Sequence, residues 1–109
     1  MLAYLQLLRP GNVILVGIAV FVGAFVAVGS EVVDYQNDLK IAILCSMMLV
    51  GGGNALNDYN DRKTDGKNHP NRPLPSGKIS EENAILYAKG LLLVGLLILV
   101  SKLDDSTPF

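Results

Sequence analysis

The chain of 109 residues has a single cysteine, Cys45, and a single histidine, His69. One cysteine gives no disulfide framework, and neither residue has a nearby Cys or His with which to share a metal ion. We therefore expect Cys45 to be a small buried side chain in an apolar segment, and His69 to be a loop residue. Thiol-based metal clusters and disulfide-stapled folds are excluded.

The glycine-rich motifs of nucleotide-binding loops and calcium loops are also missing. Gly77-Lys78 is followed by Ile79 instead of Ser or Thr, and Arg72 stands where the first glycine of a P-loop belongs. An EF-hand that began at Asp58 would have Lys63 in place of its glycine. The net charge is −1, and no nucleic-acid partner is expected.

What the chain has in quantity is apolar residues, which make up 50% of it, against 17% charged residues. They are concentrated in three blocks, and the first of these, residues 13–29, contains no charge. About 20 apolar residues in a helix cross a hydrocarbon core of about 30 Å. The sequence therefore predicts an all-α, membrane-embedded fold with three transmembrane helices, at about residues 11–29, 40–57 and 83–100.

The charges outside these blocks differ in sign from one connection to the next. The connection between the second and third blocks holds five basic residues among its acids, whereas the connection between the first and second carries Glu31, Asp34 and Asp38 and no base before Lys40. Since basic loops stay on the cytoplasmic side, we expect a multi-pass protein of the cell membrane with its N-terminus and its Asp-rich loop in the cytoplasm. The tail after Val100 would lie outside.

Several acidic residues directly extend the second apolar block. Asn57, Asp61 and Asp65 are four residues apart, so on one helix of about 100° per residue they share a narrow stripe, which Asp58 borders. We expect the helix to continue through Asp65 and to stop at Gly66. A carboxylate at the centre of a span costs about 2.5–3.5 kcal/mol, so the stripe must face a polar cavity or the aqueous rim.

Two uses fit such a stripe. It is either a solvated charged surface or a cation site, and hard oxygen ligands of this kind suit Mg²⁺ together with substrate phosphates. The stripe is nearly pure Asp and extends a span, which favours the metal. A phosphorylated lipid is then the expected substrate.

Features around the stripe predict its surroundings. Residues 67–77 contain three prolines and indicate a non-helical loop, and Ser80 is a helix N-cap. The glycines at 51–53 would allow a neighbouring helix or a substrate to approach the backbone closely. Tyr4 and Arg9 are expected to be headgroup anchors ahead of a helix break at Pro10.

Two motifs carry a resemblance to a known family. The run N-D-x-x-D-x-x-x-D at residues 57–65, followed by N-R-P-x-P-S-G at residues 71–77, resembles the first aspartate-rich motif of the UbiA-type intramembrane prenyltransferases and the sequence after it. The opening Arg9-Pro10-Gly11-Asn12 and residues 52–59 are most similar to the archaeal branch of that family, which makes membrane ether lipids.

The resemblance implies a single partial UbiA-type domain over residues 1–109, with the Asp-rich helix end and loop at 57–80. It would be the N-terminal third of a bundle of about nine membrane helices. The implied activity is the Mg²⁺-dependent transfer of a prenyl group, expected to be geranylgeranyl, from its pyrophosphate. The implied acceptor is a lipid such as geranylgeranylglyceryl phosphate.

The resemblance also implies roles for single residues. Asp61 and Asp65 would be catalytic through the metal. The metal ligands would be Asn57, Asp58, Asp61 and Asp65. Substrate contacts would come from Asn54, Arg72 and Lys78, and Arg72 could equally be a turn-locking residue beside the prolines.

The chain departs from the family pattern in one respect. A second aspartate-rich motif is expected, but Asp104 and Asp105 have no carboxylate four residues on. We therefore expect half of a site, which binds Mg²⁺ and pyrophosphate weakly without turnover. The alternatives are a second chain that supplies the missing helices, a non-catalytic membrane subunit or an inactive fragment, and an enzyme that acts on an aromatic or porphyrin acceptor.

Overall fold

The computed structural model describes residues 2–105, and these contain helices but no strand. The helices are α1 (Leu2–Leu8), α2 (Pro10–Val28), the 3-10 helix η1 (Gly29–Tyr35), α3 (Gln36–Asn60), α4 (Arg62–Asn68) and α5 (Glu81–Asp105). The all-α prediction is confirmed for this part of the chain. Expectations for Met1 and for the tail 106–109 lie outside the described residues.

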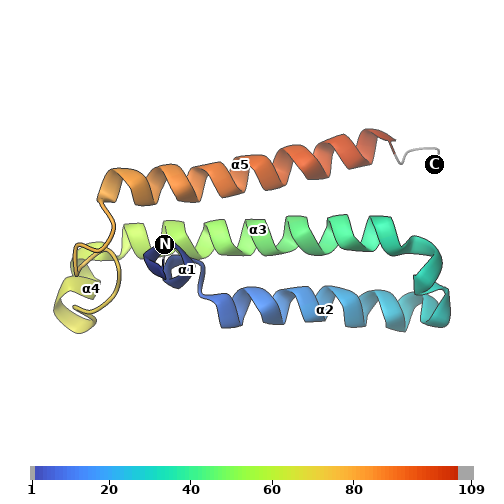
Figure 1. Ribbon diagram of the computed structural model, residues 1–109, viewed down its shortest axis with the longest axis horizontal. Helices are drawn as coiled ribbons and strands as arrows, with labels where there is room; N and C mark the ends of the chain where they lie inside the picture. The colour runs from blue at the N-terminus through green and yellow to red at the C-terminus, as the bar shows by residue number, and fades with distance from the viewer. Residues whose placement is uncertain (1, 106–109) are drawn as a thin grey trace.

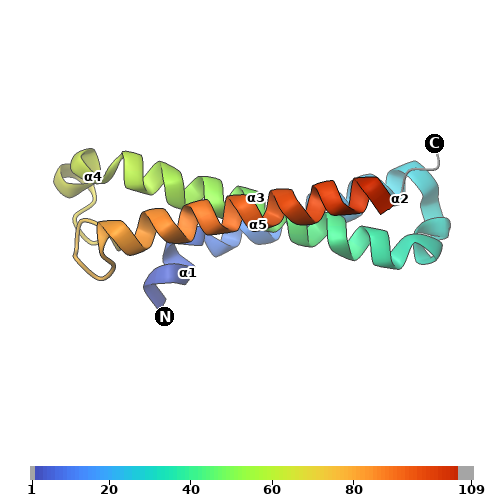
Figure 2. The same cartoon turned by 90° about the horizontal axis from the view of Figure 1, so that it is seen from above.

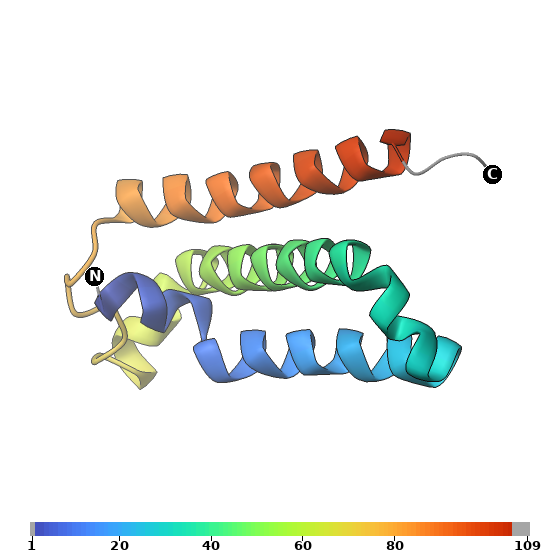
Figure 3. The same ribbon diagram turned by 45° about the vertical axis from the view of Figure 1, so that its right-hand side comes forward.

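The three long helices lie side by side in an elongated bundle of 49 × 25 × 21 Å. Figure 1 shows α3 between α2 and α5, and both neighbours run antiparallel to it. The turned view in Figure 3 keeps this order. As a consequence α1, the end of α3, α4 and the start of α5 meet at one end of the bundle, and η1 closes the other end (Figure 2).

Apolar side chains cover the outside of the bundle. Many large ones are more than half exposed, including Leu15, Val26 and Leu86 at 65%, 79% and 67%. Two stretches are long and apolar enough to cross a membrane, Pro10–Asn60 and Glu81–Lys102, with mean hydropathies of 2.6 and 2.3. The first is folded back on itself at η1, so α2 and α3 are its two antiparallel arms. A surface of this kind is suited to lipid, whereas a soluble monomer rarely exposes so large an apolar patch.

The closely packed core lies at the polar end of the bundle. Its buried members come from α1, α3, the loop after α4, and α5: Leu7, Ala55, Leu74, Ile79, Ala84 and Ala88. Tyr4 packs edge-to-face against Tyr87 with ring centroids 4.9 Å apart, so it fixes α1 to α5 rather than facing only the headgroups. This core holds α1 and the loop against α3.

Two glycines of α3 allow the helices to come this close, as the sequence predicted. A Cβ atom at Gly51 would lie 2.7 Å from Leu8 Cδ2, and one at Gly52 would lie 2.9 Å from Leu92 Cγ and 3.1 Å from the Ala88 carbonyl oxygen. Gly53 has open space around its Cβ position. The close approach is therefore between helices, at Gly51 for α1 and at Gly52 for α5.

The expected single helix through the acidic stretch is wrong in detail. α3 ends at Asn60, Asp61 has φ −93° and ψ 7°, and α4 then runs to Asn68 with Gly66 inside it. The 5→1 hydrogen bonds from Asp61 N to Asn57 O and from Asp65 N to Asp61 O persist, so the break is a kink and not a separation. Its effect is that the predicted stripe does not lie on one straight face.

Candidate functional site

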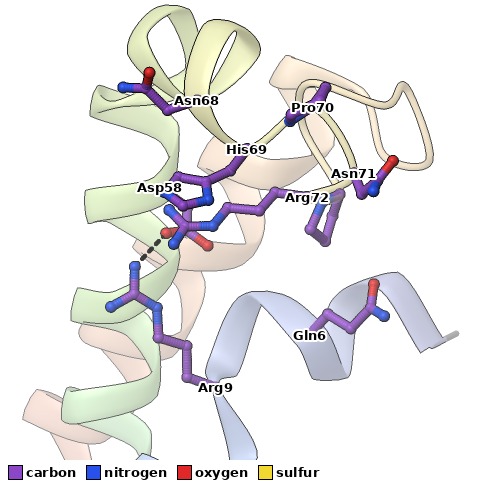
Figure 4. Close-up of a pocket in the computed structure, with 9 residues that line it drawn as sticks. Gln6, Arg9, Asp58, Asn68, His69, Pro70, Asn71 and Arg72 are labelled. Atoms are coloured by element: carbon purple, nitrogen blue, oxygen red, sulfur yellow. Dashed lines mark hydrogen bonds and ion pairs between the residues drawn. The ribbon is translucent and has the colours of Figure 1, made fainter.

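A polar pocket of about 580 Å³ lies where α1, α3 and the loop after α4 meet (Figure 4). Its lining residues are Gln6, Arg9, Asp58, Asn68, His69, Pro70, Asn71, Arg72 and Pro73. The loop from His69 to Ser80 forms one wall because Pro73, Leu74 and Ile79 are buried against the core. The site thus lies at the polar end of an otherwise apolar bundle.

Arg9 and Asp58 form an ion pair across this pocket. Arg9 Nη2 donates a hydrogen bond of 2.6 Å to Asp58 Oδ1, and Asp58 is only 5% exposed. Arg9 is the one non-glycine residue with positive φ among the described residues, at 56°, and Pro10 follows it as the first residue of α2. The strained backbone at this junction directs the guanidinium to α3.

Asp65 and Arg72 form a second pair behind the pocket wall. Arg72 Nη1 donates to Asp65 Oδ1 at 3.0 Å, and Asp65 is also 5% exposed. Asp65 Oδ2 is buried and has no hydrogen-bond partner among the described residues. A buried carboxylate oxygen without a partner costs free energy, so this atom is a candidate contact for a cation or a donor.

The other predicted site residues are not brought together in the pocket. Asn57 and Asp61 are exposed and do not line it, and Lys78 is exposed on the loop beyond it. Asn54 Nδ2 donates to the Leu8 carbonyl oxygen at 2.9 Å, which ties α3 to the end of α1. In this structure Asn54 therefore holds the end of α1, next to Arg9, and Arg72 is the only predicted substrate contact that lines the pocket.

The donor chemistry of the acidic residues fits Mg²⁺. No group of three His, Cys, Asp or Glu side chains that could hold a metal is found between residues 2 and 105. Mg²⁺, however, usually binds through one or two carboxylates plus substrate phosphates and keeps several waters. The unpartnered Oδ2 of Asp65 and the exposed carboxylate of Asp61, four residues earlier, are oxygen donors of that kind.

Of the nine lining residues only Asp58 and Arg72 were predicted as site residues, and the charged or titratable ones that sequence reasoning missed are Arg9 and His69. Arg9 was expected to be a headgroup anchor, yet it pairs with Asp58, and His69 was expected to be only a loop residue, yet it lines the pocket (Figure 4). The signal for Arg9 was its place in the Arg9-Pro10-Gly11-Asn12 run. For His69 no local signal exists, because the proline loop brings it to α3.

Arg62 lies outside the pocket and joins the end of α3 to the start of α5. It donates to Glu81 Oε1 at 2.8 Å and to the Tyr59 carbonyl oxygen at 2.8 Å, and its guanidinium lies 4.2 Å from the Tyr59 ring centroid. The kink after α3 is thereby tied to the first turn of α5. Tyr59 presents its ring to Arg62, a cation–π contact within the protein.

Comparison with known proteins agrees with the resemblance seen in the sequence. The model of the UbiA prenyltransferase family matches residues 13–105. Similar curated proteins include three named digeranylgeranylglyceryl phosphate synthase. The one from Natronomonas pharaonis is 39% identical over 93 residues, 85% of this chain and 32% of that protein. The one from Methanospirillum hungatei is 37% identical over 94 residues, with 85% and 32% covered.

The third, from Methanobrevibacter smithii, is 38% identical over 105 residues, 94% of this chain and 35% of the relative. The chain thus spans about a third of the length of the curated relatives it matches. No solved structure matches it significantly.

Proposed function

Because this chain belongs to the UbiA prenyltransferase family, we propose that it forms part of a membrane enzyme that transfers a geranylgeranyl group from geranylgeranyl diphosphate to geranylgeranylglyceryl phosphate. The names of its relatives support this reaction, and archaeal ether lipids are the corresponding products. The aromatic-acceptor alternative has no support from these names. The remaining two thirds of the relatives' length would supply the rest of the site.

We propose that α2, α3 and α5 each cross the membrane as part of a single partial domain over residues 1–109. Their apolar outer faces support this arrangement. Helices α1 and α4 and the loop from His69 to Ser80 lie at one end of the bundle, where Lys63, Lys67 and Lys78 are exposed. By the positive-inside rule this end would be cytoplasmic, and η1 would lie on the opposite side.

In the proposed site Asp61 and Asp65 would hold Mg²⁺ against the diphosphate of the prenyl donor, with Asn57 as a further oxygen ligand. Asp58, the fourth ligand that the family resemblance implies, is instead held by Arg9. When bound, the metal would neutralise the charge that develops on the leaving diphosphate. Arg72 is paired with Asp65 and would add a fixed positive charge beside that group. Lys78 would reach the diphosphate only if the loop moved, because it is exposed outside the pocket.

One observation carries this proposal: the buried Asp65, half paired with Arg72 and half unpartnered, at the polar end of an apolar bundle. A buried carboxylate oxygen is seldom left without a hydrogen-bond partner or a bound ligand. The apolar helices around the pocket would limit water access, and a carbocation formed from the donor would then be captured by the acceptor hydroxyl.

A chimera tests the proposal. The matching 105-residue segment of the Methanobrevibacter smithii relative is replaced by this chain, and the protein is reconstituted in lipid vesicles. We expect Mg²⁺-dependent formation of the digeranylgeranyl product, identified by mass spectrometry. An inserted, folded chimera that makes no product beside an active parent would contradict the proposal and favour a non-catalytic membrane subunit.

A further inference from the structure

We infer that the polar pocket binds the phosphate group of the lipid acceptor, a phosphomonoester held by Arg9 and Arg72 without a metal ion. The inference rests on the proposed function, since it assigns the second substrate of the same reaction. It separates two anionic groups that the proposed reaction must hold at once, the diphosphate of the donor and the monophosphate of the acceptor.

The two guanidinium groups come from opposite walls of the pocket. Arg9 lies at the start of α2, and Arg72 extends from the loop toward the face of α3 that carries Asp58 (Figure 4). Each side chain is 39% exposed, so part of it faces the pocket. Guanidinium groups have several N–H donors, and each pair described above uses a single nitrogen.

The carboxylates hold these arginines in place before a ligand arrives. Asp58 and Asp65 have side chains only 7% exposed, and each fixes a single nitrogen of its partner. A long side chain that is already ordered loses less entropy when it binds. Arginine also matches phosphate oxygens with paired N–H groups, which lysine cannot do.

The rest of the lining suits an anion. Gln6, Asn68 and Asn71 provide amide donors, His69 adds an imidazole, and Asp58 is the only carboxylate among the lining residues. With His69 neutral, two arginines against one aspartate give the lining a charge of +1. A volume of about 580 Å³ exceeds that of a lone phosphate and leaves room for an attached glyceryl group.

The position of Asp65 separates this anion from the donor. Neither Asp61 nor Asp65 lines the pocket, and Arg72 lies between the pocket and Asp65. A metal-bound diphosphate would need the unpartnered Oδ2 of Asp65, an atom outside the pocket. The acceptor phosphate and the donor diphosphate would then occupy adjacent places, with Arg72 between them.

Titration of the full chain in lipid nanodiscs tests the site, with inorganic phosphate and glycerol 1-phosphate as probes, EDTA present, and equal ionic strength. We expect both probes to bind without metal. Arg9→Lys and Arg72→Lys should each weaken binding about tenfold, the loss of one charge-assisted hydrogen bond. Lys67→Gln, which removes an exposed charge from neighbouring α4, should leave binding unchanged.

If Arg9→Lys fails to fold, the pair Arg9→Gln with Asp58→Asn removes both charges together, so that no buried carboxylate is left unpaired, and should also lose phosphate binding. The inference is overturned if the monophosphates do not bind, or if binding survives in all the arginine variants. Binding of inorganic diphosphate with Mg²⁺ alone would assign the arginines to the donor and leave the proposed function intact.

The chimera gives a second readout. Arg9→Lys should raise KM for geranylgeranylglyceryl phosphate about tenfold and leave KM for geranylgeranyl diphosphate nearly unchanged. An equal rise in both would contradict an acceptor site. Monophosphate binding in a chain whose chimera transfers no prenyl group would instead sink the proposed function and leave the anion site standing.

Discussion

Replacing Gly52 by alanine should loosen the contact between α3 and α5. The new Cβ would lie 2.9 Å from Leu92 Cγ and 3.1 Å from the Ala88 carbonyl oxygen, and the second of these atoms is backbone. The helix cannot yield there by rotating a side chain. Overpacking of this kind costs about 1–3 kcal/mol.

Gly53 provides the matched control, because it is the next residue of the same helix and its Cβ would meet nothing within 4 Å. Exchange of glycine for alanine inside a helix stabilises it by about 1 kcal/mol. Gly53→Ala should raise the free energy of unfolding by that amount. In Gly52→Ala the overlap of the new Cβ with Leu92 and the Ala88 carbonyl oxygen offsets the same gain. The two variants should differ by about 1–3 kcal/mol in the free energy of unfolding.

The single thiol makes this difference measurable. Cys45 is 2% exposed, so a thiol-reactive fluorogenic maleimide reports its exposure as the chain unfolds in detergent. For a chain of this size 1 kcal/mol corresponds to about 4–8 °C in Tm. We expect Gly52→Ala to melt at least about 4 °C below Gly53→Ala. Equal melting temperatures would refute the close approach of α5 to Gly52.

Three further predictions concern the polar end. Arg9→Ala should lower the free energy of unfolding by about 3 kcal/mol in the same assay, because it leaves the buried carboxylate of Asp58 unpaired. Asp58→Asn leaves only a partly exposed arginine unpaired and should cost less. A larger loss in Asp58→Asn than in Arg9→Ala would contradict this pairing. Ser80→Ala removes the acceptor for Asn83 N–H at 3.1 Å and should cost about 1 kcal/mol by thermal unfolding. The 109-residue chain alone should bind Mg²⁺ and geranylgeranyl diphosphate weakly, and product formed by the purified chain would show that reasoning to be wrong.

The helices could be predicted from the sequence because they depend on local signals. Apolar runs located α2, α3 and α5 to within a few residues, Pro10 marked the start of α2, and Ser80 caps α5 as expected. The kink at Asp61 could not be predicted, because no Gly or Pro marks it. Tertiary contacts set it: Arg62 binds the Tyr59 carbonyl oxygen and reaches Glu81 on α5.

The chemistry of the site could be predicted from the spacing of its acids, but the arrangement could not. The motif at residues 57–65 located the polar end of the bundle. Which acids are buried depends on their partners: Arg9 lies 49 residues from Asp58, and Arg72, seven residues after Asp65, is turned back to it by the loop after α4. Asp58 and Asp65 are therefore buried and paired, whereas Asn57 and Asp61 of the same stretch are exposed.

The most direct test of the central claim is the rate of Mg²⁺-dependent geranylgeranyl transfer by the chimera with Asp65→Asn. This change keeps the shape of the side chain and the oxygen that Arg72 binds, but it removes the charge that would hold the metal. Asp34→Asn, an exposed site on η1 at the far end of the bundle, is the matched control. We predict transfer at least about 100-fold slower in Asp65→Asn, with parental rates in the control. Parental rates in both would contradict the assignment of Asp65 to the metal and the diphosphate.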